Sequence, residues 1–204
     1  MPIYSPDLLS KIKDNDPTVT ELICSKVKRV NLTSQDVENI ATALQNNTAI
    51  ETISFLGNSI NANAAQLLAQ FFKVNTRLKN IHLGTCDLRS NVSILLQELE
   101  SHPSVVLLDL NTNSLDDAAG FHIASLLEKN TVLEELEVGS NNFTIQVYQT
   151  MKNALEKNHE LAAKLNFCSI PEQYFDTPEK KVIQEIQDLC ETIKSSIARK
   201  MLSH

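Results

Sequence analysis

The sequence predicts an α/β solenoid, in which short parallel strands alternate with helices and stack along one axis. Two observations predict it. An apolar pattern recurs about every 28 residues, and apolar residues at helical spacing follow each copy. One such unit cannot bury its own apolar face, so neighbouring units must stack to form a core. Aromatic residues make up only 5% of the chain and Trp is absent, so aliphatic residues must build that core.

Residues 133–143 give the pattern in its clearest form, L-x-x-L-x-L-x-x-N-x-L with Val and Phe as apolar equivalents. Leu136 and Val138 alternate with polar residues, as a strand with one buried face requires. Asn141 follows the strand, where its amide can satisfy backbone groups of adjacent turns. This segment is therefore predicted to form one strand and the turn after it.

The same pattern occurs at five other places. Its first apolar positions are separated by 23, 28, 27, 28 and 29 residues, and they are Val27, Ile50, Leu78, Val105, Leu133 and Ala162. This spacing predicts five to six repeats over residues 27–170. Residues 18–26 leave an alternative open for the first strand, because Val19, Leu22 and Cys24 also fit the strand positions.

A helix is predicted between successive strands. The apolar stripes include Ala65 to Phe72, Val92 to Leu99, Ala119 to Leu127 and Val147 to Leu155. Polar pairs follow the helices, namely Asn47-Thr48, Asn75-Thr76, His102-Pro103, Asn130-Thr131 and Asn158-His159. Asn tolerates the left-handed conformation that often ends a helix, and Pro cannot continue one. Cys86 takes the Asn position of its repeat, and we interpret it as a structural residue of the turns.

Helical caps are predicted at both ends. Residues 1–26 form the N-terminal cap, with a short helix over 7–13, and residues 171–204 form the C-terminal cap. Thr177-Pro178-Glu179 has the features of a helix start, and the helix is expected to continue to about Met201. It is expected to fold back over the last repeat; the alternatives are a free coiled coil and a helix that docks on a partner.

Charge and composition exclude several classes of function. The net charge of −7 argues against nucleic-acid binding and against an anionic membrane surface. No secretory signal peptide and no membrane-spanning apolar run are visible. The four Cys lie far apart without metal-ligand spacing, which favours reduced thiols in a cytoplasmic protein. The sequence predicts no metal and no cofactor.

Residues 7–170 resemble leucine-rich repeats of the ribonuclease-inhibitor type. The segments 75–81 and 130–136, each beginning Asn-Thr, and the segment 15–22 look most like the tropomodulin branch. The resemblance implies a curved solenoid with a parallel concave sheet and convex helices, and, for the tropomodulins, capping of actin filaments at the pointed end. The Asn-rich repeats are also similar in style to effectors that intracellular bacteria deliver into host cells without a classical signal peptide.

The outward strand positions are the candidate binding surface. They run from basic residues at the N-terminal end to acidic residues at the other, and three apolar residues interrupt them. The predicted partner-binding residues are Lys28, Arg29, Glu51, Ser54, Leu56, Lys79, His82, Val106, Leu107, Asp109, Asn111, Glu134, Glu135 and Glu137.

Apolar residues rimmed by charge are typical of a protein interface, and Leu107 is the expected centre of contact. The sequence shows no nucleophile elbow and no phosphate loop, so we expect neither an enzyme nor a small-molecule substrate. The expected function is a non-enzymatic module that inhibits or scaffolds a protein, either a host protein or another effector if the chain is a bacterial effector. The alternative is a tropomodulin-like regulator of actin-filament pointed ends.

Overall fold

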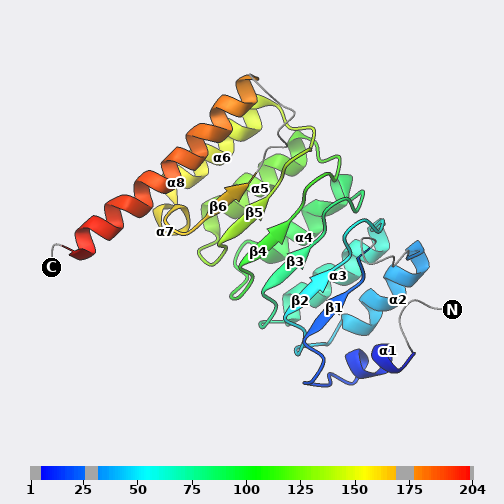
Figure 1. Cartoon of the computed structure of the whole chain (residues 1–204). Coiled ribbons are helices and arrows are strands. Elements are labelled where there is room, and N and C mark those ends of the chain that lie inside the picture. The colour runs from blue at the N-terminus through cyan, green and yellow to red at the C-terminus, as the bar shows by residue number, and fades with distance from the viewer. Residues whose placement is uncertain (1–5, 26–31, 169–176, 203–204) are drawn as a thin grey trace.

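A computed structural model describes residues 6–25, 32–168 and 177–202 of the chain (Figure 1). In these residues one parallel sheet contains six strands in sequential order. The strands are β1 (Glu21–Ile23), β2 (Thr52–Ser54), β3 (Asn80–His82), β4 (Leu107–Asp109), β5 (Glu135–Glu137) and β6 (Asn166–Cys168). Each strand has only three residues, so the sheet is a narrow ribbon along the solenoid.

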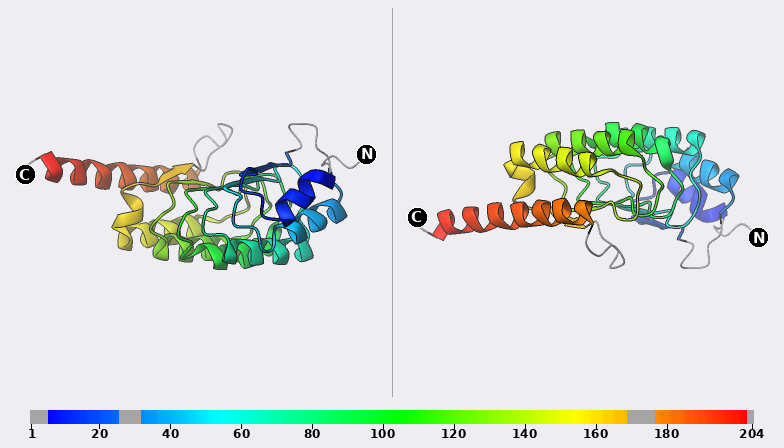
Figure 2. Two further views of the ribbon diagram at one scale, coloured as in Figure 1. Left: turned by 90° about the horizontal axis from the view of Figure 1, so that it is seen from below. Right: turned by 90° about the horizontal axis from the view of Figure 1, so that it is seen from above.

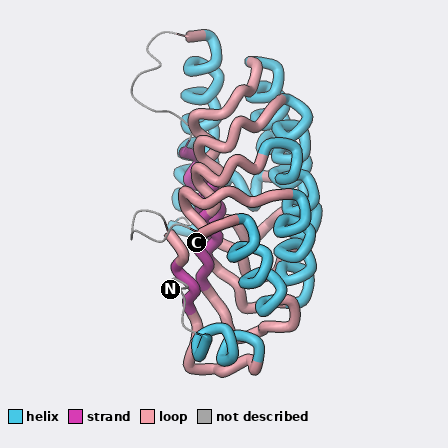
Figure 3. Tube along the Cα trace, turned by 90° about the vertical axis from the view of Figure 1, so that its right-hand side faces the viewer, coloured by secondary structure: helices cyan, strands magenta, loops and turns pink. Residues whose placement is uncertain are grey.

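Helices alternate with the strands and lie on one side of the sheet (Figure 3). They are α1 (Pro6–Lys13), α2 (Ser34–Leu44), α3 (Ala62–Val74), a 3₁₀ turn η2 (Arg89–Asn91) that leads into α4 (Val92–Leu99), α5 (Asp117–Lys129), α6 (Ile145–Lys157), α7 (His159–Ala162) and α8 (Pro178–Leu202). The predicted α/β solenoid with a C-terminal helix is confirmed.

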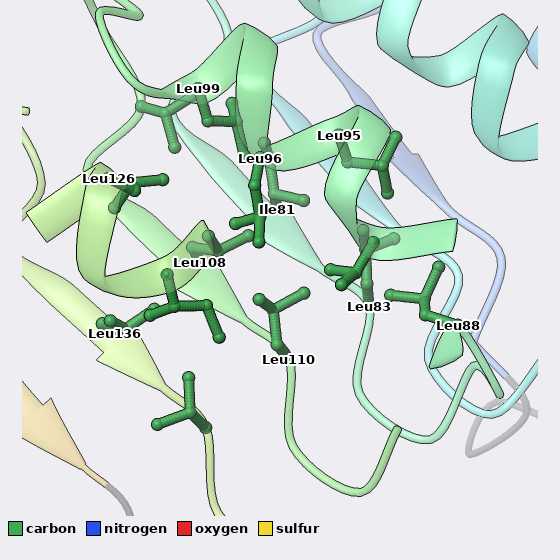
Figure 4. Packing of buried hydrophobic residues seen from close by; sticks show 14 of the residues in the cluster. Ile81, Leu83, Leu88, Leu95, Leu96, Leu99, Leu108, Leu110, Leu126 and Leu136 are labelled. Carbon is green, nitrogen blue, oxygen red and sulfur yellow. The ribbon is translucent and has the colours of Figure 1, made fainter. Parts of the chain in front are cut away.

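The core lies between the sheet and the helices. The strand register places the middle residue of every strand in one buried row, which consists of Leu22, Ile53, Ile81, Leu108, Leu136 and Phe167. Leu108 and Ile81 face Leu95, Leu96 and Leu99 of the helix layer (Figure 4). The repeat pattern therefore specifies one continuous aliphatic core, in which each repeat contacts mainly its neighbours.

The first strand lies earlier than the repeat beginning at Val27 predicted. Leu22 of β1 is in register with Ile53, so the alternative start at Val19 is correct for this repeat. Gln35 and Val37, which the Val27 prediction assigned to the turn after a strand, lie within α2. The segment 26–31, which contains Val27, lies outside the described residues. The first repeat is therefore longer than the others, because β1 and β2 are 31 residues apart.

One ladder of polar side chains links the turns that follow the strands. The Oδ1 of Asn113 accepts hydrogen bonds from the amides of Cys86 and Leu88 in the preceding repeat, at 2.9 and 3.2 Å. Asn141 contacts the preceding repeat in the same way. Cys86 donates its thiol to the carbonyl of Phe55 at 3.2 Å, and burial raises the pKa of this thiol to about 12. Cys86 is therefore a buried structural residue of the ladder.

A second ladder lies where the helices end. Asn130 is buried; its Nδ2 donates to Leu99 O at 2.9 Å and its Oδ1 accepts from the amides of Val132 and Leu133, both at 2.8 Å. Asn47 and Asn75 repeat this arrangement. Asn75 and Asn130 have φ values of −89° and −71°, so they are not left-handed. The conformational reason given above for these Asn residues is therefore wrong, and their side-chain hydrogen bonds explain them.

His102 takes the Asn place in this second ladder. Its Nε2 lies 2.9 Å from Asn75 O, and its Nδ1 accepts from the amides of Ser104 and Val105 at 3.4 and 3.3 Å. A neutral imidazole with the proton on Nε2 satisfies all three contacts, whereas a protonated ring would lose its acceptor. Burial lowers the pKa of His102 below its usual value of 6.5, although the backbone contacts with Asn75 and Phe72 oppose this shift.

We expect this lowered pKa to make stability depend on pH. The unfolded chain binds the proton of His102 more tightly than the folded chain does, so folding is favoured above pH 6.5. This contribution should decrease as the pH falls from about 6.5 towards the folded-state pKa. Urea unfolding at a series of pH values measures it. His102→Asn, which restores the usual ladder residue, should flatten that part of the profile; an unchanged profile would assign the dependence to other groups.

Helix α8 closes the C-terminal end of the solenoid and then extends past it. Val182, Ile183, Ile186 and Cys190 are buried against the last repeat, and Gln187 donates to Phe167 O at 3.1 Å. Residues 195–199 are all exposed, and this part of the helix projects beyond the body (Figure 2). The first part of α8 therefore folds back over the last repeat as expected, but its C-terminal part does not.

Candidate functional site

The outer face of the sheet is the candidate site, because within the described residues the helices of the repeats cover only the opposite face (Figure 3). The register aligns two rows of outward side chains. The first row contains Glu21, Thr52, Asn80, Leu107, Glu135 and Asn166, and the second contains Ile23, Ser54, His82, Asp109 and Glu137. Neighbouring strands lie about 4.8 Å apart, so residues of one row can act together on a partner. We call this surface the open face.

The structure brings most of the predicted site residues together on the open face. Ser54, His82, Leu107, Asp109, Glu135 and Glu137 lie on the strands themselves. Glu51, Lys79, Val106 and Glu134 directly precede the strands, and Leu56 and Asn111 follow them. Lys28 and Arg29 lie outside the described residues. Because β1 occupies residues 21–23, the strand position at which Lys28 and Arg29 were placed is filled by Glu21 and Ile23.

The basic residues next to β2 and β3 are matched by a carboxylate. Lys79 Nζ lies 2.8 Å from Glu51 Oε2, and Arg77 also forms an ion pair with Glu51. Hydrogen bonds from Lys79 and Arg77 hold the pKa of Glu51 below its usual value. The expected excess of positive charge at this end is therefore offset by Glu51 among the described residues.

The acidic end lies on β5. Glu134 is exposed, Glu135 and Glu137 are half-buried, and all three lie on consecutive outward positions around this strand. Within the described residues, Glu134 and Glu135 have no Lys, Arg or His nitrogen within 4.0 Å of their carboxylates. These two carboxylates are thus free to pair with a cation that a partner supplies.

A polar network lies beside them. Asp109 is only 8% exposed and accepts a hydrogen bond from Asn111 N at 2.9 Å. The side chain of Asn111 donates to Glu137 and accepts from Gly139 N at 2.6 Å. Burial raises the pKa of Asp109, while the hydrogen bond from Asn111 and the nearby His82 oppose that shift. The network fixes the orientation of Glu137 and leaves Asp109 little surface for contact.

The three apolar residues of the face are half-buried and not fully exposed. Leu107 lies in the first outward row between Asn80 and Glu135. Leu56 covers Gly84, where a Cβ atom would lie 2.8 Å from Leu56 Cδ1 and 2.7 Å from Asp109 Oδ2. Glycine at position 84 therefore lets Leu56 and Asp109 approach the same point of the sheet, and Leu107 and Val106 remain the apolar residues next to the acidic end.

Large exposed apolar side chains lie elsewhere in the described residues, at Val74, Ile94, Phe121 and Ile197. All four are on helices, and the strand pattern that guided the sequence-based prediction could not identify them. An apolar residue outside the stripe of its helix was the available signal, as for Phe121 in α5. They do not belong to the open face.

The turns that leave the strands form the rim of the open face. Gly57, Thr85, Thr112 and Ser140 occupy the same position in successive repeats, and all have φ between 54° and 79°. A non-glycine residue in this left-handed region costs about 1–3 kcal/mol. Hydrogen bonds between repeats offset it, such as Thr85 N to Asn111 O at 2.8 Å and Thr112 N to Gly139 O at 2.9 Å. The rim is therefore held rigidly, and the sequence gave no signal of it because three of these residues are Thr or Ser.

The described residues show no cluster of three or more His, Cys, Asp and Glu side chains that could hold a metal ion. In the same part of the chain, no helix has both the length and the apolar composition needed to cross a bilayer. The geometry of the open face is that of a preformed surface with half-buried apolar residues and carboxylates. This arrangement is suited to contact with another macromolecule.

Comparison with known proteins identifies distant relatives. No family model matches the chain. Human leiomodin-2 is 29% identical over 139 residues, which are 66% of this chain and 25% of that protein. The Rho GTPase-activating protein gacW of Dictyostelium discoideum is 22% identical over 193 residues, 85% of this chain and 17% of that protein. The chain thus spans about a quarter of the length of the leiomodins that it matches.

Two solved structures are similar over most of the chain. Leiomodin-1 actin-binding site 2 covers 97% of this chain and 96% of that one, with a TM-score of 0.47 and 14% identity. The tropomodulin C-terminal domain of Caenorhabditis elegans covers 97% and 98%, with a TM-score of 0.48 and 14% identity. By sequence, the chain is a distant homologue of the leiomodins over about two thirds of its length.

Proposed function

We propose that the chain is a non-enzymatic protein-binding module that holds its partner on the open face, and that this partner is actin. The sequence relationship to leiomodin-2 carries the proposal. It agrees with the tropomodulin-like Asn-Thr segments at 75–81 and 130–136, for which the resemblance implies an actin partner. Of the two functions expected from the sequence, the actin-directed one is favoured over an inhibitor, scaffold or bacterial effector acting on another protein.

The open face supports this function through its shape and charge. It belongs to a sheet whose strands are tied to each other by parallel pairing and whose turns are tied by two side-chain ladders. A rigid surface loses little conformational entropy on binding, so more of the contact energy appears as affinity. Leu107 and Val106 would be buried further by a partner, and Glu134 and Glu135 would pair with cationic side chains at the edge of that contact.

We expect the double substitution Glu134→Lys and Glu135→Lys to weaken binding to monomeric actin at least tenfold, because it replaces two free carboxylates with repelling charges. Fluorescence anisotropy with labelled actin measures the affinity. Elongation of filaments from seeds with blocked barbed ends then shows whether the bound chain acts at pointed ends.

The matched control is Glu98→Lys with Glu156→Lys, which changes the net charge equally but lies on α4 and α6 at the opposite side of the molecule. This control should bind as the natural chain does. Equal weakening by both double variants would assign the effect to net charge and contradict the open face as the binding surface. A natural chain that shows no affinity for actin would refute the choice of partner.

A further inference from the structure

The exposed end of α8 is an amphipathic helix without a place to dock on its own chain. Ile193 is half-buried at the edge of the body, and Ile197 is 37% exposed. Both continue the stripe of Ile186 and Cys190, which is buried against the last repeat. Isolated helices shorter than about 12–15 residues are marginally stable in water. The segment beyond Ile193 therefore gains only what its continuity with the packed part of α8 provides.

This end of the helix is basic, in a chain that is acidic as a whole. The sequence from Thr192 to Leu202 contains three basic residues and no acidic one, whereas the whole chain has a net charge of −7. Among the described contacts, Lys194 Nζ lies 3.2 Å from Glu191 in an exposed pair, and Arg199 Nε donates only to the carbonyl of Ser195 at 3.2 Å. An exposed Ile between basic residues is the pattern of a helix that docks on an apolar surface with an acidic rim.

The molecule presents such a surface at the other side of its fold. On the open face, Leu107 and Val106 are half-buried next to Glu134 and Glu135, whose carboxylates have no cationic partner among the described residues. The six strands span about 24 Å, at about 4.8 Å per strand spacing, and a helix with its side chains is about 10 Å across. The open face is therefore wide enough for one helix.

We propose that the projecting end of α8 from one copy docks on the open face of a second copy. Ile197 contacts Leu107 and Val106, and Arg199 pairs with Glu134 or Glu135. The docked helix (the tail) and the open face (the head) are different surfaces, so each copy can engage one copy through its head and another through its tail. Such head-to-tail contacts build chains unless the geometry closes them into a ring. This inference does not depend on actin, but it implies that self-association and the proposed partner compete for one surface.

Sedimentation velocity on the protein alone, over a concentration series at low and high ionic strength, tests the proposal. The natural chain should form species larger than a monomer as concentration rises, and salt should weaken them because the contact is partly electrostatic. Ile197→Asp impairs the tail, and Glu134→Lys with Glu135→Lys impairs the head. Each should raise the concentration needed for association at least tenfold, and the Glu98→Lys, Glu156→Lys control should not.

Mixing the two impaired variants gives the sharpest result. The Ile197→Asp chain keeps its head and the Glu134→Lys, Glu135→Lys chain keeps its tail, so an equal mixture should form one junction and stop at a dimer. A monomer at all concentrations would overturn the proposal. So would association that the head variant leaves intact, because it would indicate pairing between two α8 helices. Thermal unfolding of each variant monitors the fold, which the exposed positions should leave unchanged.

Discussion

Replacing Asn130 with Ala is expected to lower the free energy of unfolding by about 3 kcal/mol or more. The substitution leaves Leu99 O and the amides of Val132 and Leu133 without their partner, and these groups lie at a buried side chain that is 3% exposed. A buried polar group left unsatisfied costs about 1–3 kcal/mol. Urea denaturation followed by circular dichroism measures the change.

Asn153→Ala is the matched control, because Asn153 lies exposed on α6. Surface substitutions usually change stability by less than about 0.5 kcal/mol. The ladder interpretation requires a large difference between the two variants. A loss at Asn130 of less than about 1 kcal/mol would mean that water replaces the side chain and that the ladder contributes little.

Gly120→Ala is expected to destabilise the protein by about 1–3 kcal/mol, the usual cost of overpacking a core. A Cβ atom at this position would lie 2.3 Å from Val147 Cγ1 and 3.1 Å from Phe143 Cδ1. The close approach of α5 and α6 therefore depends on glycine. Urea denaturation again measures the loss, and the size of the effect reports how far α6 can move.

Val147→Ala provides the test of that cause. Alone it removes two buried methyl groups and should destabilise by about 2 kcal/mol, at about 0.8 kcal/mol per group plus a cavity. In the Gly120→Ala background the same change removes the clashing atom, so it should restore part of the lost stability. Strict additivity of the two losses would show that contact between these positions is not the reason for glycine.

The sequence was sufficient for the architecture because each repeat is a local unit with its own strand, turn and helix. Leu136 and Val138 repeat the roles of Leu108 and Leu110, and the register of β4 and β5 aligns them. Such a pattern fixes both which face of the strand is buried and how neighbouring strands pair. The prediction was wrong where one repeat is longer, since regular spacing favoured Val27 although Leu22 pairs with Ile53.

The polar ladders show a different limit. Asn75 and Asn130 were identified as recurring residues, but the reason was wrong because single-residue conformational preferences do not show contacts between repeats. Their partners are backbone groups 25 to 31 residues away, at Ile50 and Leu99. The same contacts explain His102, whose Nδ1 and Nε2 reproduce the acceptor and donor of an amide. Spacing from Asn75 and Asn130 was the signal for its role.

The candidate site was predictable in location and less so in detail. The alternation of the strands places Leu107 and Glu135 on the outer face, as expected. It does not show that Asp109 is buried, because that burial depends on the approach permitted by Gly84 and on the amide of Asn111. Nor does it show that Lys79 is paired with Glu51 across neighbouring repeats. Side-chain pairing and burial depend on three-dimensional packing that a one-dimensional pattern leaves open.

The most direct measurement of our central proposal is carboxylate footprinting of the chain with and without monomeric actin. Labelling with a carbodiimide and mass spectrometry reports which carboxylates a partner covers. We predict that Glu134 and Glu135 lose reactivity in the complex while Glu98 and Glu156, on α4 and α6, keep theirs. Protection of Glu98 and Glu156 with unchanged labelling of Glu134 and Glu135 would contradict the open face as the binding surface.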